Sequence, residues 1–472
     1  MTERIPKSVL VGGAILAPVF LALLAYSQPG YFTSQTYLGG LLLLELICAA
    51  LWMYRQVFFP LILIAFLFAG TGLAVGGGWT VARWVFLGFG AAGGCVIMFK
   101  ERGQRFGLFH IVALFAVLAA TVSAAVSRYP DLAILKALSL LLLFVYAATG
   151  ARLAVAGREP RFFSGLLVGC EIFVGVIAVS YMVGREVMGN PNSLGAVIGV
   201  ACAPILLWGT LLKEKPLVHN QRLAMLAVCF YLVFYSHSRA GIVATLFSCG
   251  LMCFALRKFK VFAQGLGAIL ILVAAYAIVQ PAAFSNLIAG LTSSVVYKGH
   301  DPTLGVLASR ESPWQAAVES ITSNFWFGTG FGTADNGKDI AEGTDRLSTS
   351  QGVTTENGSS YLAIVEWVGI LGVLPFLFLV LAIVGKTVRT VRWMLSTGNP
   401  SHPAVPIAMV MVAGLIHAAF EDWLFAPGYY LCVFFWSLAF VLADVAPKSL
   451  PDQAPVRPWL FRQSAGSVAP RA

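Results

Sequence analysis

Charged residues are scarce in this 472-residue chain: only 11% are Asp, Glu, Lys or Arg, whereas 58% are hydrophobic and the mean hydropathy is +0.83. Soluble globular domains carry about a quarter charged residues. The composition therefore excludes an ordinary soluble domain and indicates a chain that lies mostly in a membrane. The formal net charge of +10 comes largely from loops between apolar runs, so it is a topology signal and not a nucleic-acid-binding surface.

Cysteine is absent from the predicted outer loops, because all eight cysteines fall within apolar runs. This placement predicts no structural disulfide. A CxxC pair and a Cys/His cluster are also missing, so no metal site is expected. The segment GTADNGKD (332–339) has the glycine and lysine spacing of a P-loop, but it ends in Asp where the magnesium-binding Ser or Thr is needed. An ATP-binding loop is therefore excluded.

The sequence contains long apolar runs, which predict transmembrane helices. About 20 helical residues cross the hydrocarbon core of a bilayer. We predict an all-α polytopic membrane protein with about fourteen transmembrane helices, or twelve or thirteen if the short and closely spaced runs merge. The first run lacks a small-residue cleavage site, so we expect a retained helix. The predicted spans are residues 8–26, 36–53, 57–77, 82–99, 107–127, 132–150, 162–182, 193–212, 222–236, 241–256, 261–280, 360–385, 403–420 and 429–446.

The distribution of lysine and arginine predicts the orientation. Twenty-two of the 31 fall in loops or tails on one side of the predicted membrane, eight on the other, and Lys136 lies within a span. By the positive-inside rule the richer side is cytoplasmic, as are both termini. The predicted organisation is eleven spans in residues 1–280, a large periplasmic loop at 281–359, three spans in 360–447 and a disordered cytoplasmic tail at 448–472.

The large loop contains one predicted helix, near residues 312–326. Ser312, Pro313 and Gln315 have the spacing of a capping box. An amphipathic helix on the outer leaflet and a helix packed on other outer loops fit equally well. The glycine cluster that follows, Phe327–Gly332, predicts a turn. The apolar residues that recur on one helix face are Trp314, Val318, Ile321 and Phe325.

Charged residues from separate parts of the chain are predicted to face the same outer compartment. A charge at membrane depth costs about 3 kcal/mol even on lenient scales. Three cations and three carboxylates together indicate an anionic substrate and acid–base chemistry, although any single arginine has an interfacial role as its alternative. These six residues are Arg185, Arg239, Arg310, Glu356, Glu421 and Asp422. A second set of charged residues lies in or near the predicted spans: Glu45, Glu171, Glu366 and Lys136. Their favoured role is hydrogen bonding between helices, and the alternative is proton transfer in a proton-coupled transporter.

Four stretches of the sequence, in this order, resemble the O-antigen ligase and polysaccharide polymerase superfamily of bacterial inner membranes. They are GNPNSLGAVIG (189–199), SHSRAGIVATL (236–246), SRESPWQAAVESITSNFWFGTGFG (309–332) and GSSYLAIVEWVGILGV (358–373). The similarity covers about residues 180–445. It implies an enzyme that moves a glycan from undecaprenyl diphosphate to an acceptor hydroxyl at the periplasmic face, with no nucleotide sugar, metal or other cofactor.

The resemblance also implies roles for individual residues. Arg239 and Arg310 match the family's turn and loop arginines and would hold the diphosphate, with Arg185 as a third candidate. Guanidinium groups bind phosphate oxygens in bidentate fashion and stabilise the charge that develops as the sugar–phosphate bond breaks.

The chain departs from the ligase pattern at one position. The histidine that ligases place before the last motif falls on Gly358, with Ser359 as its neighbour, so the expected base is missing. Glu356, two residues upstream, is the nearest acid–base group and is expected to be the general base. Further candidates are Glu421, Asp422, His300, His237 and His417.

The missing histidine favours a polymerase that extends O-antigen or exopolysaccharide repeat units with inversion at the anomeric carbon. The alternatives are a ligase that transfers finished glycan to lipid A core or another acceptor, a polytopic transporter, and an inactive member of the superfamily. The expected partners are an undecaprenyl-diphosphate-linked oligosaccharide and an acceptor glycan or lipid. The sequence leaves open whether a chain-length regulator or a flippase acts with the protein.

Overall fold

The computed structural model describes residues 23–24, 26–28, 30, 34–71, 78–101, 106–185, 187–188, 190–212, 215–291, 293, 308–333 and 358–448. Their regular structure is helical, and these residues contain no β-strand. The helices are α3 (Gln35–Trp52), α4 (Tyr54–Ala69), α5 (Gly78–Glu101), α6 (Leu108–Ala125), α7 (Pro130–Tyr146), η1 (Ala147–Ala151), α8 (Arg152–Val155), α9 (Glu159–Met182), α10 (Pro191–Ala196), η2 (Val197–Cys202), α11 (Ala203–Leu211), α12 (Pro216–Tyr235), α13 (Arg239–Ala255), α14 (Phe259–Val279), α15 (Pro281–Leu291), α16 (Ala308–Ser323), α17 (Ser360–Thr397), α18 (Ala404–His417) and α19 (Tyr430–Val445).

Seven of the described helical segments are long and apolar enough to cross a membrane. Five further apolar helices are shorter, among them α13, α18 and α19. The all-helical, membrane-spanning class expected from composition is therefore confirmed. The total of fourteen spans and the large outer loop remain predictions, and the first predicted span lies almost entirely outside the described residues.

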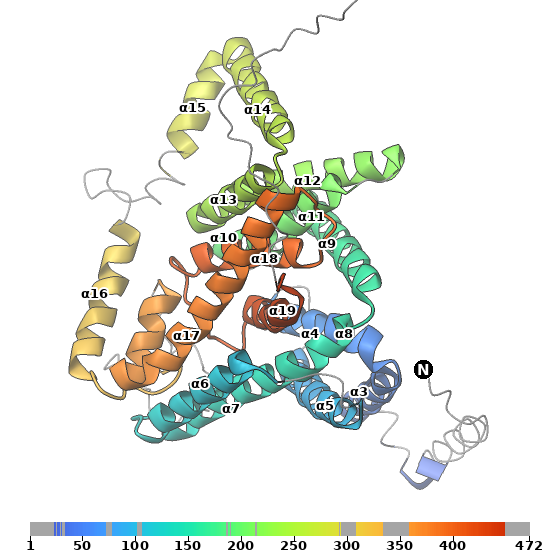
Figure 1. The fold of residues 1–472 in the computed structure, drawn as a ribbon, viewed down its shortest axis with the longest axis vertical. Helices are drawn as coiled ribbons and strands as arrows, with labels where there is room; N and C mark the ends of the chain where they lie inside the picture. The colour runs from blue at the N-terminus through green and yellow to red at the C-terminus, as the bar shows by residue number, and fades with distance from the viewer. Residues whose placement is uncertain are drawn as a thin grey trace, which may run out of the picture.

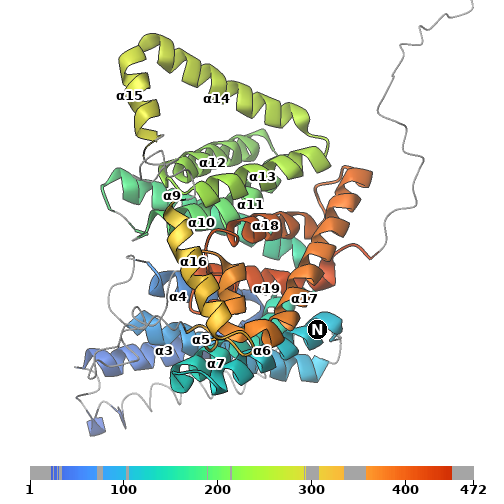
Figure 2. The ribbon, with the colours of Figure 1, turned by 90° about the vertical axis from the view of Figure 1, so that its left-hand side faces the viewer.

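The helices form two groups around a central helix. Figure 1 shows α3 to α8 in one group, α9 to α13 in the other, and α19 between them. Every residue of α19 from Tyr430 to Leu442 is buried. Helix α17 runs along α6 in both views, and α14 and α15 project from the body of the molecule (Figures 1 and 2). The strongly apolar sequence of α19 thus follows from its place inside the bundle, where all of its faces meet other helices.

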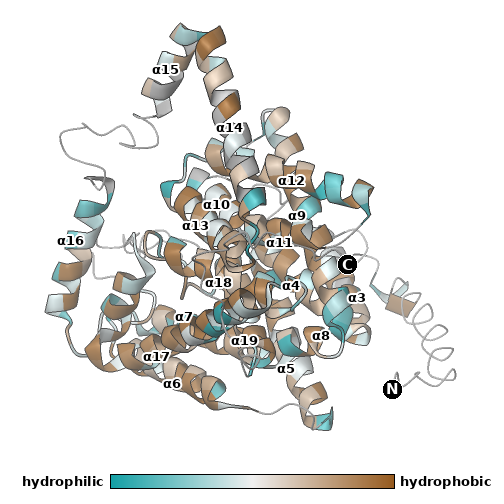
Figure 3. Cartoon of the chain, turned by 45° about the horizontal axis from the view of Figure 1, so that its top comes forward, coloured by the Kyte–Doolittle hydropathy of each residue, from teal (hydrophilic) through white to brown (hydrophobic). Residues whose placement is uncertain are grey.

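Polar residues gather at helix ends while the helix bodies are hydrophobic (Figure 3). At one end of the bundle, Arg55 pairs with Glu101, and Arg152 Nη2 lies 3.0 Å from Asp444 Oδ1. Each of these contacts joins helix ends that the positive-inside rule assigns to a single side of the membrane. These two contacts agree with the predicted sidedness of the residues that make them, and the partition of the remaining charges is still a prediction.

The predicted capping box at Ser312 is wrong. Helix α16 already includes Ala308, so Pro313 lies inside the helix and Ser312 does not cap it. Pro313 is the sixth residue of α16, so its ring removes one backbone hydrogen bond of the helix. The helix itself is present over most of the predicted range, and Val318 and Phe325 on its predicted apolar face are half exposed.

Two other helix boundaries differ from the sequence prediction. Helix α12 begins at Pro216, six residues before the predicted span, because a buried ion pair allows Arg222 to lie within it. Helix α17 continues to Thr397 through a polar stretch that hydropathy excluded. The short helix α15 follows Pro281 in a region that the sequence assigned to the loop.

The glycine cluster after α16 forms the predicted turn and packs into a break in α17. Gly328, Gly330 and Gly332 all have positive φ, as does Gly369 at the break. Backbone hydrogen bonds join the two segments, including Thr329 N–H to the Glu366 carbonyl at 2.9 Å and Ile370 N–H to the Phe325 carbonyl at 2.9 Å. The C-terminal end of α16 is thereby fixed on α17, which positions the charged residues at its other end.

Candidate functional site

The turn that precedes α13 places an arginine at a helix N-terminus. Ser236 Oγ accepts from the Ser238 N–H, and Ser238 Oγ caps the helix by accepting from the Gly241 N–H, both at 3.2 Å. His237 between them adopts φ 51° and is exposed. The two serines satisfy backbone donors at the turn, and Arg239 is the first helical residue of α13.

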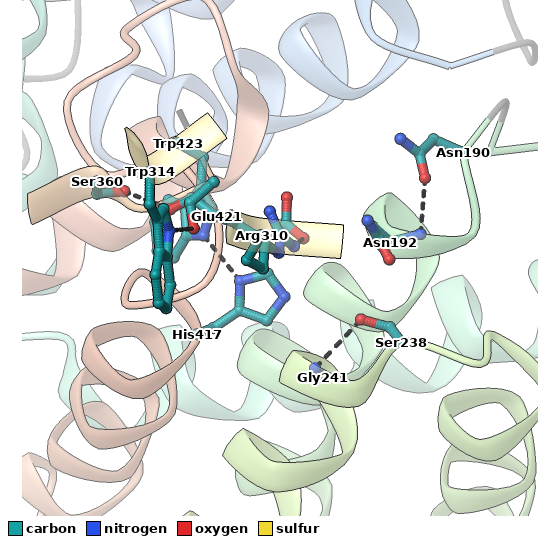
Figure 4. A network of polar contacts seen from close by, with 11 residues as sticks. Asn190, Asn192, Ser238, Gly241, Arg310, Trp314, Ser360, His417, Glu421 and Trp423 are labelled. Carbon is teal, nitrogen blue, oxygen red and sulfur yellow. Dashed lines mark hydrogen bonds and ion pairs between the residues drawn. The ribbon is translucent and has the colours of Figure 1, made fainter. Parts of the chain in front are cut away.

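The start of the α10–η2–α11 span lies directly beside the start of α13. Asn190 Oδ1 caps α10 by accepting from the Asn192 N–H at 2.8 Å. The two helices touch through glycines, because a Cβ on Gly241 would lie 2.8 Å from the Gly195 carbonyl oxygen. The N-terminal ends of α10 and α13, marked by Asn190 and Ser238, therefore lie side by side, and each carries partial positive charge (Figure 4).

Arg310 approaches this region from α16, far along the chain. Its guanidinium Nη2 pairs with Glu421 Oε1 in the loop between α18 and α19, and both side chains are mostly buried. Burial lowers the pKa of Arg239, and the positive charge of Arg310 lowers it further. A bound anion would offset the positive charges of the two arginines.

The segment that lacks the ligase histidine packs on Arg310. Gly358 has φ 60°, and a Cβ added there would lie 2.7 Å from Arg310 Nη1. Trp314 Nε1–H donates to the Gly358 carbonyl at 3.3 Å, and Ser360 N–H donates to the Glu421 carbonyl at 3.1 Å. The position at which the family pattern expects a histidine is thus against the arginine, and in this chain it is occupied by a glycine in a left-handed conformation.

A buried histidine lies beside the same arginine. His417, the last residue of α18, is 1% exposed, and its Nδ1 accepts from Trp423 Nε1–H at 2.9 Å. The neutral ring must then carry its proton on Nε2, and within the described part of the chain Nε2 has no hydrogen-bond partner. Arg310 is close enough for its charge to act on the ring, so an imidazolium here would be a second buried cation. His417 is therefore a neutral donor at the site (Figure 4).

The remaining candidates are placed as follows. Arg185 is exposed, and its side chain makes no ion pair with any residue that the structure describes. Asp422 is half buried, and burial raises the pKa of the neighbouring Tyr429 phenol, which the negative charges of Glu421 and Asp422 raise further. Arg239, Arg310, Glu421 and Asp422 are thus the predicted residues that gather at this end of the bundle. The predicted candidates Glu356 and His300 lie outside the described residues.

The intramembrane charges that a transporter would need have structural partners instead. Lys136 Nζ donates to the Gly332 carbonyl and so holds the glycine turn. Glu171 Oε1 lies 3.4 Å from Arg222 Nε, between α9 and α12. Glu45 is exposed on α3. The Glu171 pair agrees with the helix-to-helix role that the sequence favoured, whereas Lys136 holds a turn and Glu45 is exposed.

In the sequence, His417 is only one of several further acid–base candidates, and Trp423 has no predicted role. The pattern H-x-x-x-E-D-W at the end of an apolar run was the available signal. A histidine at a helix end is usually packed in the interior, and only the folded chain shows that one ring nitrogen is occupied by an indole while the other lacks a partner. The contact of Gly358 with Arg310 had no sequence signal.

Comparison with known proteins identifies a family for part of the chain. Residues 224–377 match the family model described as Wzy_C: O-Antigen ligase. A comparison with curated proteins gives no match. The matched segment contains Arg239, Arg310, the glycine turn and Gly358, whereas His417 and Glu421 lie beyond it. The match, which covers less than half of the chain, supports similarity of residues 224–377 to the O-antigen ligase superfamily.

Proposed function

We propose that this protein is a membrane glycosyltransferase that extends a polysaccharide by transferring lipid-linked repeat units, with the donor carried on undecaprenyl diphosphate. The observation that carries the proposal is the ion pair of Arg310 with Glu421, which lies near the N-terminal ends of α10 and α13, the second of which begins with Arg239. Such a cluster of fixed donors suits a diphosphate, whose negative charge increases as the bond to the sugar breaks.

In the proposed reaction an acceptor hydroxyl attacks the anomeric carbon of the donor sugar. The bond from that carbon to the phosphate oxygen breaks with inversion, and the diphosphate leaves with both bonding electrons. Arg239 and Arg310 neutralise this charge, and Nε2–H of His417 donates to one of its oxygens. Glu421 keeps Arg310 in place through the ion pair.

We assign to Glu356 the role of the general base, which takes the proton of the acceptor hydroxyl. Its sequence position is two residues before Gly358, which lies against Arg310. Glu421 is less suited to this task because its Oε1 is engaged by the guanidinium. His417 is not suited, because its unoccupied nitrogen is the protonated one and cannot accept.

Glu356→Gln tests this assignment. A carboxamide cannot take the proton, and loss of a general base lowers rates by about 10² to 10⁴-fold. We expect a loss of this size in the turnover of purified protein with lipid-linked substrate, with Glu311→Gln, an exposed carboxylate of α16, as the control. An unchanged rate for Glu356→Gln would remove this residue from the mechanism.

Ligation to lipid A core or another acceptor is the second candidate, and the description of the matched family favours it. Gly358 in place of the histidine favours polymerisation. Deletion of the gene in its host, followed by mass spectrometry of the undecaprenyl-linked glycans, separates the two. Single lipid-linked repeat units would accumulate without a polymerase, whereas long lipid-linked chains that lack an acceptor would accumulate without a ligase.

A further inference from the structure

A groove of about 580 Å³ opens between the two groups of helices, away from the arginine pair. Its lining residues come mainly from α4 and α9, with others from η2 and the start of α19. The walls are almost wholly apolar and include Phe59 and Leu63 from α4 and Phe162, Leu166 and Phe173 from α9. An apolar groove that is open at the side of a membrane-spanning bundle is accessible to lipid chains.

One end of this groove is strongly basic. Arg55, Arg158 and Arg161 line it where α4 and α9 begin. Arg55 is paired with Glu101, whereas the guanidinium groups of Arg158 and Arg161 make no hydrogen bond or ion pair to any described residue. At the opposite end lies Tyr430, whose hydroxyl is 3.5 Å from the Ser193 carbonyl beside α10. The basic end is therefore the one remote from the candidate site.

The length of the groove fits a lipid chain. The lining residues of α9 run from Arg161 to Val176, which corresponds to about 22 Å at about 1.5 Å per residue. This distance exceeds half of the hydrocarbon core, which is about 30 Å thick. A molecule with a phosphate at the arginines and a chain of this length along α9 would satisfy both ends of the groove.

We propose that the groove binds an anionic phospholipid, with its phosphate on Arg158 and Arg161 and an acyl chain along α9. Guanidinium groups match phosphate oxygens, and basic pockets between transmembrane helices bind anionic head groups. The polyprenyl chain of the donor is the competing occupant, but its diphosphate would lie at the opposite end, by Arg310. That occupant would not require Arg158 or Arg161.

Native mass spectrometry of the full-length protein in detergent, titrated with phosphatidylglycerol or phosphatidylcholine, tests the head-group half of the proposal. We expect tighter binding of phosphatidylglycerol, and the double variant Arg158→Gln/Arg161→Gln should weaken it by about 30-fold. The control is Arg389→Gln/Arg392→Gln, which removes two exposed arginines of α17 that do not line the groove. Equal binding of the two lipids, or full binding by the groove variant, would overturn the proposal.

Gly169→Leu tests the chain half. A Cβ at Gly169, which lines the groove, meets no atom within 4 Å, so leucine fills the groove without a clash in the fold. Gly175→Leu is the matched control on the same helix, since its Cβ also meets open space and the residue does not line the groove. We expect only Gly169→Leu to reduce phosphatidylglycerol binding. If Gly169→Leu instead abolishes binding of farnesyl diphosphate while the arginine variant keeps phosphatidylglycerol, the groove belongs to the donor and the proposal fails.

Discussion

Two arginine–glutamate pairs in this molecule are similar in burial and different in surroundings. Arg222 and Glu171 join α12 to α9, and their side chains are 10% and 12% exposed. Arg310 and Glu421 join α16 to the loop before α19, at 13% and 18%. Arg222 also donates to the Gly209 carbonyl at 3.2 Å, whereas Arg310 lies near a second arginine and a histidine with an unused donor. Burial and pairing therefore do not distinguish a structural pair from a binding site; an excess of positive charge does.

The largest effect should come from the arginine pair at the site. Arg310→Gln and Arg239→Gln each remove a donor to the developing charge, and loss of one such donor lowers the rate by about 10² to 10³-fold. Turnover of lipid-linked substrate in proteoliposomes is the measurement. The double variant Arg310→Gln/Glu421→Gln, which leaves no unpaired carboxylate, should be folded and still inactive. Recovery of activity in that variant would mean that the pair is only structural.

Arg222→Gln should reverse this pattern. It leaves Glu171 buried without its partner, which destabilises a protein by about 3 kcal/mol, while no group at the site changes. We expect a lower thermal midpoint in detergent and a normal rate per folded molecule. Arg222→Gln/Glu171→Gln should restore most of the lost stability. A rate loss as large as that of Arg310→Gln would erase the distinction between the two pairs.

His417→Gln and Trp423→Phe should have a smaller effect on rate. Loss of a hydrogen bond to a charged group costs about 1.5 to 3 kcal/mol, or about 10- to 100-fold in rate. The pH profile separates a donor from a base: a neutral donor contributes no acid limb, so the profile of His417→Gln should keep the shape of the wild-type profile. Disappearance of an acid limb in this variant would make His417 the general base.

Gly358→Ala should give the smallest change. A left-handed backbone costs a residue with a Cβ about 1 kcal/mol, and the added atom would also push against Arg310 Nη1. Gly398→Ala is its control, because Gly398 has φ 63° with no atom within 4 Å of an added Cβ. Both variants should lose similar stability in thermal unfolding, and only Gly358→Ala should lose a few-fold in rate. Equal rates would show that Gly358 serves only the backbone.

Much of the fold could be predicted because the dominant force is local in sequence. Apolar runs that must satisfy their own backbone in a membrane become helices, and most predicted spans coincide with a helix. The predicted ends of helices were wrong where contacts with other helices extend a helix beyond its apolar run. Arg222 lies inside a helix only because Glu171 neutralises it, and α17 extends past the apolar run because its polar end packs with other helices.

The site was predictable in its charges and not in its contacts. Charged residues in an apolar chain stand out, so Arg239, Arg310 and Glu421 could be named from the sequence. The neutral state of His417 depends on Trp423 and Arg310, and the crowding of Gly358 depends on the start of α16. These are distances between segments that only folding brings together.

The two fixed points on either side of residues 334–357 have a practical consequence. The glycine turn is hydrogen-bonded to α17, and Ser360 at the start of α17 is bonded to the loop that carries Glu421. The chain between Thr333 and Gly358 thus connects two segments that are each held in place by other parts of the molecule. A gene divided within that interval should yield two fragments that reassemble when they are expressed together. Their reassembly would restore the contact between Arg310, on the first fragment, and Glu421, on the second.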